Sequence, residues 1–151
     1  MFENLLTKYK FKGCFTFKPN EALEAKCNAP TDQNGVYLVY KVANTREDLI
    51  YIGMSGRMKD GYLKTRQSGL GGMKDRIVNG YHPKFGKVKR KKAFPKQMIK
   101  EKIPELKIYW WVTYDKENHD CPAMVEKTLK ERYLNKFGCY PAWHKCDSRR
   151  C

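Results

Sequence analysis

The sequence predicts an α+β domain in which a small central antiparallel β-sheet of about three strands is flanked by helices. A chain of 151 residues and 17.8 kDa has the usual size of one domain, here 1–151. Hydrophobic residues make up 41% of it, which is enough for a buried core and excludes a wholly disordered polypeptide. Three runs of β-branched and aromatic residues, two of them joined by a short connection, indicate the antiparallel sheet.

The three predicted strands cover 35–41 (GVYLVYK), 49–55 (LIYIGMS) and 106–114 (LKIYWWVTY). A turn signal, DQNG at 32–35, precedes the first strand, and we treat 1–32 as an N-terminal extension. The polar stretch between the first two strands is turn-like, and so short a connection requires antiparallel pairing.

Alternation of side chains divides this strand pair into two faces. One face is expected to carry the apolar residues Val36, Leu38, Tyr40, Ile50 and Ile52. The opposite face is expected to carry Tyr37, Val39, Leu49, Tyr51 and Gly53. Tyr37 and Tyr51 then lie on the same face, and Gly53 leaves room beside them.

Three helices are predicted, at 71–79, 95–102 and 122–137. The first follows a glycine-rich stretch and contains Arg76. The last begins at Pro122, a residue suited to the first helical turn, and ends before Gly138. Its apolar residues are spaced four apart and predict a core-facing stripe: Val125, Leu129 and Tyr133.

Positive charge is concentrated in the middle third of the chain. The formal net charge is +15, and residues 56–102 hold 15 of the 31 Lys and Arg but 3 of the 16 Asp and Glu. Such a surplus is typical of a protein that binds nucleic acid, although a solvated lysine-rich surface is the alternative. We expect two inserted basic loops, 56–72 and 82–95, to contact nucleic acid. The candidate residues in and near these loops are Arg57, Lys64, Arg66, Lys74, Tyr81, Lys87, Lys89, Arg90, Lys91 and Lys92.

No run approaches the roughly 18 uncharged apolar residues that a membrane-spanning helix needs, and the N-terminus lacks the apolar segment of a signal peptide. We therefore expect a cytoplasmic protein without a membrane partner, whose six cysteines are thiols. No pair has CxxC spacing. A zinc-dependent structural protein, with Cys139, His144, Cys146 and Cys151 as ligands, is a third possibility and predicts stoichiometric zinc.

Four separated features resemble the GIY-YIG nuclease family. GVY at 35–37 and YIG at 51–53 are similar to its two-strand signature, with Val36 in place of isoleucine. The helix MKDRIVN is similar to the family's arginine-bearing helix, which places Arg76 at the catalytic arginine. Glu126, on the helix after the third strand, matches the metal-binding glutamate. The resemblance covers about 33–145, most of the chain.

The resemblance implies a set of catalytic roles. Glu126 would hold one divalent cation, Mg²⁺ or Mn²⁺, and Arg76 would bind the phosphate. Tyr37 would activate the attacking water, with Tyr51 supporting it. A free tyrosine has a pKa near 10, so either neighbouring cations favour the phenolate of Tyr37, or Tyr37 only orients the water.

The sequence departs from the family pattern at three places. The gap between the second tyrosine and Arg76 is long and holds the first basic loop. The position four residues after Arg76, often Tyr or His in the family, is Gly80, so that Tyr81 or His82 would have to serve. His144 stands where the family has an asparagine, and a histidine can donate a hydrogen bond in its place. His82 and Lys64 are secondary candidates for contacts with the phosphate or leaving group.

The sequence thus predicts a metal-dependent DNA endonuclease, restriction-type in size and layout. Double-strand cleavage would require a homodimer or sequential nicking. A non-catalytic basic DNA- or RNA-binding module on a nuclease-like scaffold is the competing class. Within the enzyme class, a repair nuclease acting on damaged or branched DNA is the main alternative.

Overall fold

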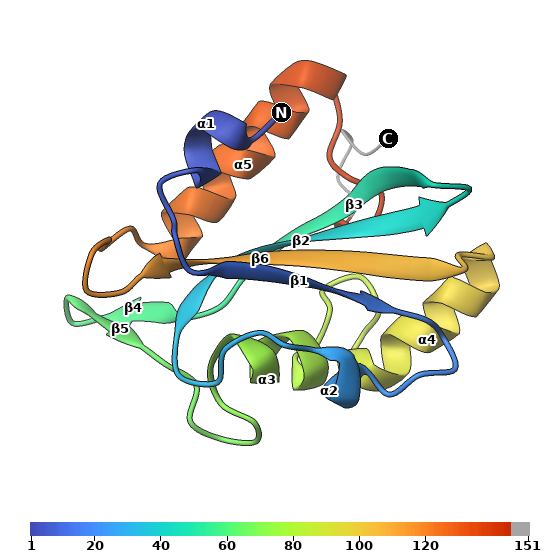
Figure 1. The fold of residues 1–151 in the computed structure, drawn as a ribbon, viewed down its shortest axis with the longest axis horizontal. Coiled ribbons are helices and arrows are strands. Elements are labelled where there is room, and N and C mark those ends of the chain that lie inside the picture. Colours follow the sequence, from blue (N-terminus) through green and yellow to red (C-terminus); the bar gives the residue numbers. More distant parts are fainter. Residues whose placement is uncertain (146–151) are drawn as a thin grey trace.

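A computed structural model describes residues 1–145 and contains a four-stranded antiparallel sheet with helices on both faces (Figure 1). The sheet order is β1-β6-β2-β3. These strands are β1 (Lys12–Phe17), β2 (Asn34–Ala43), β3 (Arg46–Met54) and β6 (Glu105–Tyr114). Helices α1 (Glu3–Leu6) and α5 (Pro122–Phe137) lie above the sheet in Figure 1. Helices α2 (Leu23–Lys26), α3 (Gly72–Asn79) and α4 (Arg90–Glu101) lie below it.

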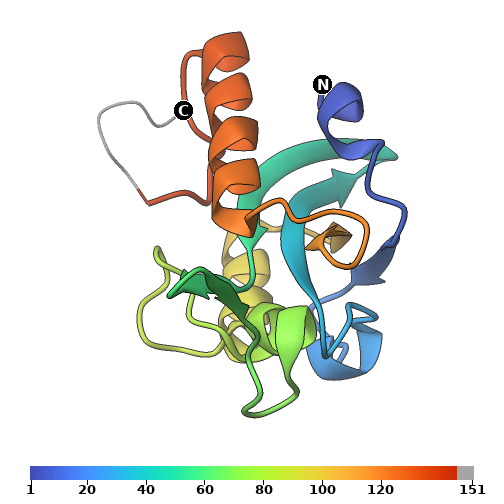
Figure 2. The same ribbon diagram turned by 90° about the vertical axis from the view of Figure 1, so that its left-hand side faces the viewer.

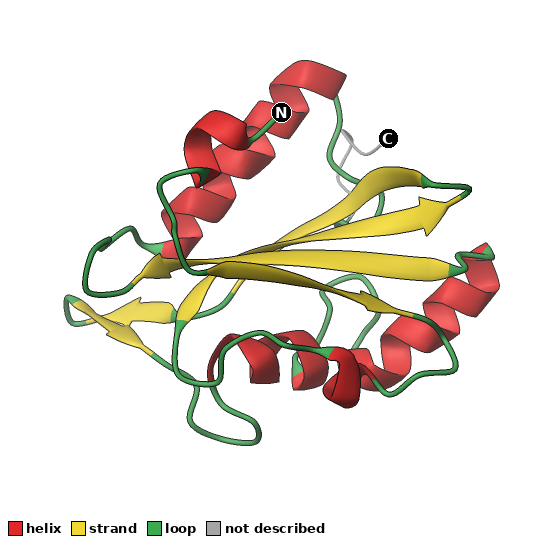
Figure 3. Cartoon of the chain, in the orientation of Figure 1, coloured by secondary structure: helices red, strands yellow, loops and turns green. Residues whose placement is uncertain are grey.

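The predicted α+β class and the antiparallel pairing of all three predicted strands are confirmed. The fourth strand, β1, was not predicted; it lies within the expected N-terminal extension and pairs with β6 from Lys12↔Trp111 to Phe17↔Leu106 (Figure 3). Only two of its six residues, Phe15 and Phe17, are buried, so its apolar signal is short.

Two hydrophobic clusters lie on opposite faces of the sheet. The cluster beneath α1 and α5 contains Val36, Leu38, Ile52 and Leu129, and the predicted stripe on the last helix packs against it. The cluster on the side of α3 and α4 contains Tyr37, Val39, Tyr51, Ile77 and Phe94. The face assignment of the two tyrosines is therefore confirmed.

The assignment of Ile50 and Leu49 is wrong because β3 contains an irregularity. Val39 pairs with Tyr51 and Tyr40 pairs with Leu49, so the register skips Ile50. Such a bulge exchanges the faces of the residues beyond it. Ile50 consequently packs in the cluster of Tyr51, and Leu49 packs on the other side.

Helix α4 begins at Arg90, five residues before the predicted start, so the second basic loop ends at Lys89 and not at residue 95. Pro95 lies inside the helix, where its missing N–H removes one backbone hydrogen bond. The buried residues of α4 form one stripe: Arg90, Ala93, Phe94 and Met98. A stripe with this spacing faces the core, so packing outweighs the proline.

The first basic loop contains a β-hairpin, β4 (Arg57–Lys59) and β5 (Tyr62–Lys64), that forms a separate two-stranded sheet. Its tip, Asp60-Gly61, has positive φ at both residues, as a tight type I′ hairpin turn requires. The hairpin and the segment 82–89 both lie on the left in Figure 2, the side away from β1.

The helices of residues 1–145 include none that is long and apolar enough to cross a bilayer. Cys14, Cys27 and Cys121 are free, whereas Cys139 is disulfide-bonded, so the expectation of a thiol is wrong there. The two other cysteines of the possible zinc site, Cys146 and Cys151, lie outside the described residues.

Candidate functional site

Tyr37 and Tyr51 lie side by side on neighbouring strands. Their ring centroids are 6.2 Å apart. Both residues are buried, with exposed fractions of 1% for Tyr37 and 6% for Tyr51. Tyr37 pairs with Gly53 across β2 and β3. A Cβ at Gly53 would lie closer than 3.0 Å to the Cζ, Oη and Cε2 atoms of Tyr37. The absence of a side chain at Gly53 therefore creates the space that the Tyr37 phenol occupies.

Arg76 lies half-buried on α3, beside Gly80. A Cβ at Gly80 would lie 3.1 Å from both Cδ and Nη1 of Arg76. The same Cβ would lie closer than 3.0 Å to the Arg76 carbonyl oxygen, so the backbone leaves no room for a side chain at the position where the family often has Tyr or His. Arg76 also lines a cavity of about 470 Å³ together with Arg57, Lys64 and Arg66.

Arg90 is the closest cation to the two tyrosines that the structure records. It is fully buried, and its Nη1 donates to the Tyr37 hydroxyl at 2.5 Å and to the Arg76 carbonyl at 2.8 Å. Its Cζ lies 5.6 Å from the ring centroids of both Tyr37 and Tyr51. The expectation that Arg90 belongs to an exposed loop is wrong, since none of its surface is available to a phosphate outside the protein.

The structure separates Tyr81 from His82. Tyr81 is 51% exposed, whereas His82 is buried. Its ring stacks on Phe85 at 4.2 Å between centroids and lies tilted against Tyr51 at 4.4 Å. Burial, and then the positive charge of Arg90, lowers the pKa of His82 to about 3. His82 is therefore neutral near pH 7 and packs against Tyr51. A neutral, buried imidazole is unsuited to protonating a leaving group.

His144 lies at the exposed edge of β3. Its Nε2 accepts a hydrogen bond from the Ile52 N–H at 3.1 Å, and the adjacent Trp143 N–H donates to the Ile50 carbonyl at 2.9 Å. Burial, and then the charge of Lys130, lowers the pKa of His144 to about 3. Its imidazole also stacks on Tyr51 at 4.8 Å. His144 thus covers the edge strand and holds Tyr51 in place.

Glu126 lies on α5, and 19% of its side chain is exposed. Lys130, one turn further along, contacts its Oε1 at 2.9 Å. Burial raises the pKa of the Tyr51 phenol, and among the nearby charges Arg90 and Arg76 lower that pKa whereas Glu126 raises it. The predicted catalytic residues Arg76 and Glu126 therefore both act on this one phenol.

The donor set at Glu126 fits only a lightly held metal ion. Residues 1–145 contain no group of three or more His, Cys, Asp or Glu side chains placed to share an ion. A single carboxylate suits Mg²⁺, which retains several waters and often completes its shell with substrate phosphate. Glu126 would be the protein ligand, and Lys130 would have to share or leave the carboxylate.

Most of the other candidate nucleic-acid contacts are exposed: Arg57, Lys64, Arg66, Tyr81, Lys87, Lys89 and Lys92. Lys74 and Lys91 are half-buried. Arg66 Nε contacts the buried Asp75 carboxylate at 2.9 Å, so part of its charge is neutralised. The remaining cations are free to meet a polyanion along one side of the molecule.

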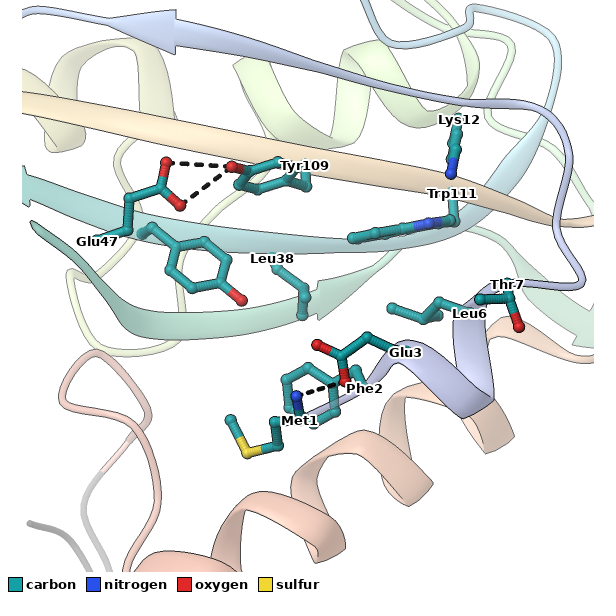
Figure 4. A pocket seen from close by; sticks show the side chains of 11 residues that line it. Met1, Phe2, Glu3, Leu6, Thr7, Lys12, Leu38, Glu47, Tyr109 and Trp111 are labelled. Carbon is teal, nitrogen blue, oxygen red and sulfur yellow. Dashed lines mark hydrogen bonds and ion pairs between the residues drawn. The ribbon is translucent and has the colours of Figure 1, made fainter. Parts of the chain in front are cut away.

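A second cavity, of about 350 Å³, lies between α1 and the strands β2 and β6, on the face opposite to the tyrosine pair (Figure 4). The carboxylates of Glu3 and Glu47 line it, together with Tyr109 and Trp111. Each of these carboxylates is paired with a cation, Glu3 with the N-terminal ammonium and Glu47 with Lys107, and none of the predicted catalytic residues lines this cavity.

Comparison of the chain with protein-family models, with curated proteins and with solved structures found no match. Arg90 and Gly80 are the two site residues whose roles sequence reasoning missed. For Arg90 a signal existed, because it stands at the start of the apolar stripe Ala93, Phe94 and Met98.

The two depressed histidine pKa values predict a loss of stability in acid. An unfolded histidine has a pKa near 6.5, so between about pH 6.5 and 3 the unfolded chain binds more protons than the folded protein. The free energy of unfolding is therefore highest above about pH 6.5 and falls as the pH is lowered through this window. Urea denaturation followed by circular dichroism at about pH 7.5 and pH 5 measures the difference.

The control for this prediction is His144→Asn, whose amide oxygen still accepts from Ile52. This variant should lose less stability between the two pH values, whereas His119→Asn at an exposed site should behave like the unaltered protein. Equal stability at both pH values in the unaltered protein would contradict the prediction.

Proposed function

We propose that this protein is a metal-dependent endonuclease of the GIY-YIG type that hydrolyses phosphodiester bonds in double-stranded DNA. The observation that carries the proposal is that Tyr37, Tyr51 and Arg90 pack together, that Arg90 contacts the backbone of Arg76, and that the Arg76 side chain lines a cavity with Arg57, Lys64 and Arg66. A cavity lined by four cations suits a phosphate backbone.

In the proposed reaction, Arg76 binds the scissile phosphate and stabilises the charge that develops on its oxygens. Tyr37, as phenolate, takes a proton from a water molecule. The water oxygen forms a bond with phosphorus while the bond to the leaving oxygen breaks, and the leaving oxygen takes a proton from solvent. Tyr51 supports Tyr37 on the same face. A divalent cation at Glu126 would supply additional stabilisation of the phosphate charge.

The hairpin supplies a surface for duplex DNA. The cross-strand pairs Arg57↔Lys64 and Lys59↔Tyr62 share one face, and Arg57 and Lys64 line the cavity with Arg76. A two-stranded ribbon has dimensions that fit a major groove. The face of the hairpin therefore extends the phosphate cavity toward the neighbouring DNA.

Replacing both Arg57 and Lys64 with Gln should weaken DNA binding similarly for all sequences. Two lost phosphate contacts should reduce the slope of log affinity against log salt by about 2. Fluorescence anisotropy with a labelled duplex at several salt concentrations measures both effects. Lys41→Gln, at an exposed position of β2, is the matched control, and an unchanged slope in the double variant would exclude the hairpin as a phosphate-binding element.

The function is tested by incubating the purified protein with supercoiled plasmid, with Mg²⁺ or Mn²⁺ and in parallel with EDTA. Nicked or linear DNA only in the metal samples is the expected result. A protein that binds the plasmid but leaves it supercoiled with every metal would contradict the enzyme and support the second candidate, a non-catalytic nucleic-acid-binding module. The near-complete burial of Tyr37 favours this second candidate, because water and phosphate must displace local packing to reach its hydroxyl.

The DNA products of this assay would also indicate the oligomeric state and the class of nuclease. Linear DNA appearing together with nicked circles would indicate a homodimer of cleaving subunits, since a single site cuts one strand. Defined ends would indicate a restriction-type enzyme, and cleavage confined to damaged or branched DNA would indicate a repair nuclease. The expected setting for either activity is the cytoplasm.

A further inference from the structure

The Arg90 side chain carries a positive charge into the interior without a carboxylate partner among residues 1–145. Its Nη1 contacts Tyr37 and Arg76, but the N–H groups of Nε and Nη2 are buried and have no hydrogen-bond partner. These two nitrogens form one edge of the planar guanidinium, the edge that binds oxyanions in a bidentate manner. A buried cation without a counter-charge normally lowers the free energy of unfolding.

The local chain geometry holds Arg90 at this place. Its backbone N–H donates to the Gly80 carbonyl at 3.0 Å, and an isolated bridge joins Tyr81 and Lys89. These contacts close the loop 80–90 and set the first turn of α4 over the end of α3. Backbone contacts at the two ends of this loop therefore position the Arg90 side chain next to Tyr37.

We propose that Arg90 is a positioning residue for the cleavage reaction: it holds the Tyr37 oxygen and balances the negative charge of its phenolate. The proposal rests on the proposed function, because it assumes that Tyr37 takes a proton from the attacking water. Because Nη1 donates to the phenol oxygen, the charge of the guanidinium lies next to the atom that would carry the phenolate charge. The two aromatic faces at 5.6 Å provide the guanidinium with a further, weaker partner in the resting protein.

Other charged and titratable groups surround the same phenols. Tyr51 faces Tyr37 from β3, and His82 lies against Tyr51 from the loop 82–89. The charge of Arg76, on α3, lowers the pKa of Tyr51. Glu126 acts on Tyr51 from α5 by raising its pKa. Among these groups Arg90 alone contacts the Tyr37 oxygen in a hydrogen bond, so it is the group placed to hold that atom.

The test compares Arg90→Met, which keeps the length of the side chain but removes its charge, with Arg90→Lys, which keeps a charge. Single-turnover cleavage is measured at saturating DNA over a range of pH, together with DNA affinity and the folded fraction. We expect Arg90→Met to lower the rate per folded molecule by about 100-fold, with unchanged DNA affinity. The rising limb of its pH–rate profile should move to higher pH, and Arg90→Lys should recover part of the rate.

A double-variant cycle separates positioning from general packing. If Arg90 acts through Tyr37, then Arg90→Met should cause little further loss in a Tyr37→Phe background. A wild-type rate and pH profile in Arg90→Met, or full additivity with Tyr37→Phe, would overturn the proposal. If Arg90→Met does not fold, Arg90→Gln, which also removes the charge, replaces it: a rate and pH profile equal to those of the unaltered protein overturn the proposal, and a lower rate with a rising limb at higher pH supports it.

Failure of the two proposals is distinguishable. An unaltered protein that cleaves no DNA with any metal contradicts the endonuclease itself. An unaltered protein that cleaves DNA, beside an Arg90→Met variant that cleaves equally well with the same pH profile, contradicts only the role of Arg90.

Discussion

Glu126→Gln is expected to reduce metal-dependent cleavage by about 1,000-fold, which corresponds to about 4 kcal/mol of transition-state stabilisation. Gln has the shape of Glu but lacks the charge that would hold the cation. DNA affinity should change little, because the basic side chains that would contact phosphate lie on the hairpin, on α3 and on the segment 82–92. Single-turnover rates at saturating DNA, together with anisotropy in EDTA, measure the two quantities separately.

Two variants of α5 serve as controls. Glu131→Gln removes the same charge at the next exposed carboxylate of the helix and should leave cleavage unchanged. Lys130→Gln removes the cation that contacts Glu126 Oε1 at 2.9 Å and should lower the Mg²⁺ concentration needed for half-maximal rate. Full activity of Glu126→Gln with purified metal would exclude the proposed metal ligand.

The central sheet and the longest helix could be predicted because their signals are local. The alternation in 35–41 placed Tyr37 on one face, and Pro122 and Gly138 mark the two ends of α5, where Gly138 adopts the left-handed conformation. The adjacency of Tyr37 and Tyr51 followed from strand pairing alone. Periodicity and capping residues act over a few positions, so a single sequence is enough to reveal them.

The remaining features depend on contacts that are distant in the sequence. The bulge at Ile50 depends on the register between two strands, and no residue type in the sequence indicates that register. Arg90 lies in a run of lysines, where charge predicts exposure, but the closure of the loop 80–90 by the Gly80 carbonyl carries it inside. The lack of space for a side chain at Gly80 depends on how closely the Arg76 carbonyl approaches it, which only the folded backbone determines.

Gly53→Ala should abolish most of the activity by displacing the Tyr37 phenol. The new methyl group would lie closer than 3.0 Å to three atoms of Tyr37, which is buried and held by Arg90, so that the ring must move. Misplacement by about 1 Å can cost about 100-fold in rate. Overpacking at this place should also lower the free energy of unfolding by about 1–3 kcal/mol. Single-turnover cleavage and urea denaturation measure the two effects.

Gly86→Ala is the matched control for Gly53→Ala. A Cβ at Gly86 would meet no atom within 4 Å, although its φ of +79° makes any side chain unfavourable. This variant should therefore lose about 1 kcal/mol of stability without losing cleavage per folded molecule. If Gly53→Ala cleaved at the rate of Gly86→Ala, the position of the Tyr37 phenol over Gly53 would have no part in the reaction. The loss expected only for Gly53→Ala follows from geometry, because the two substitutions are chemically the same and differ in what their methyl groups contact.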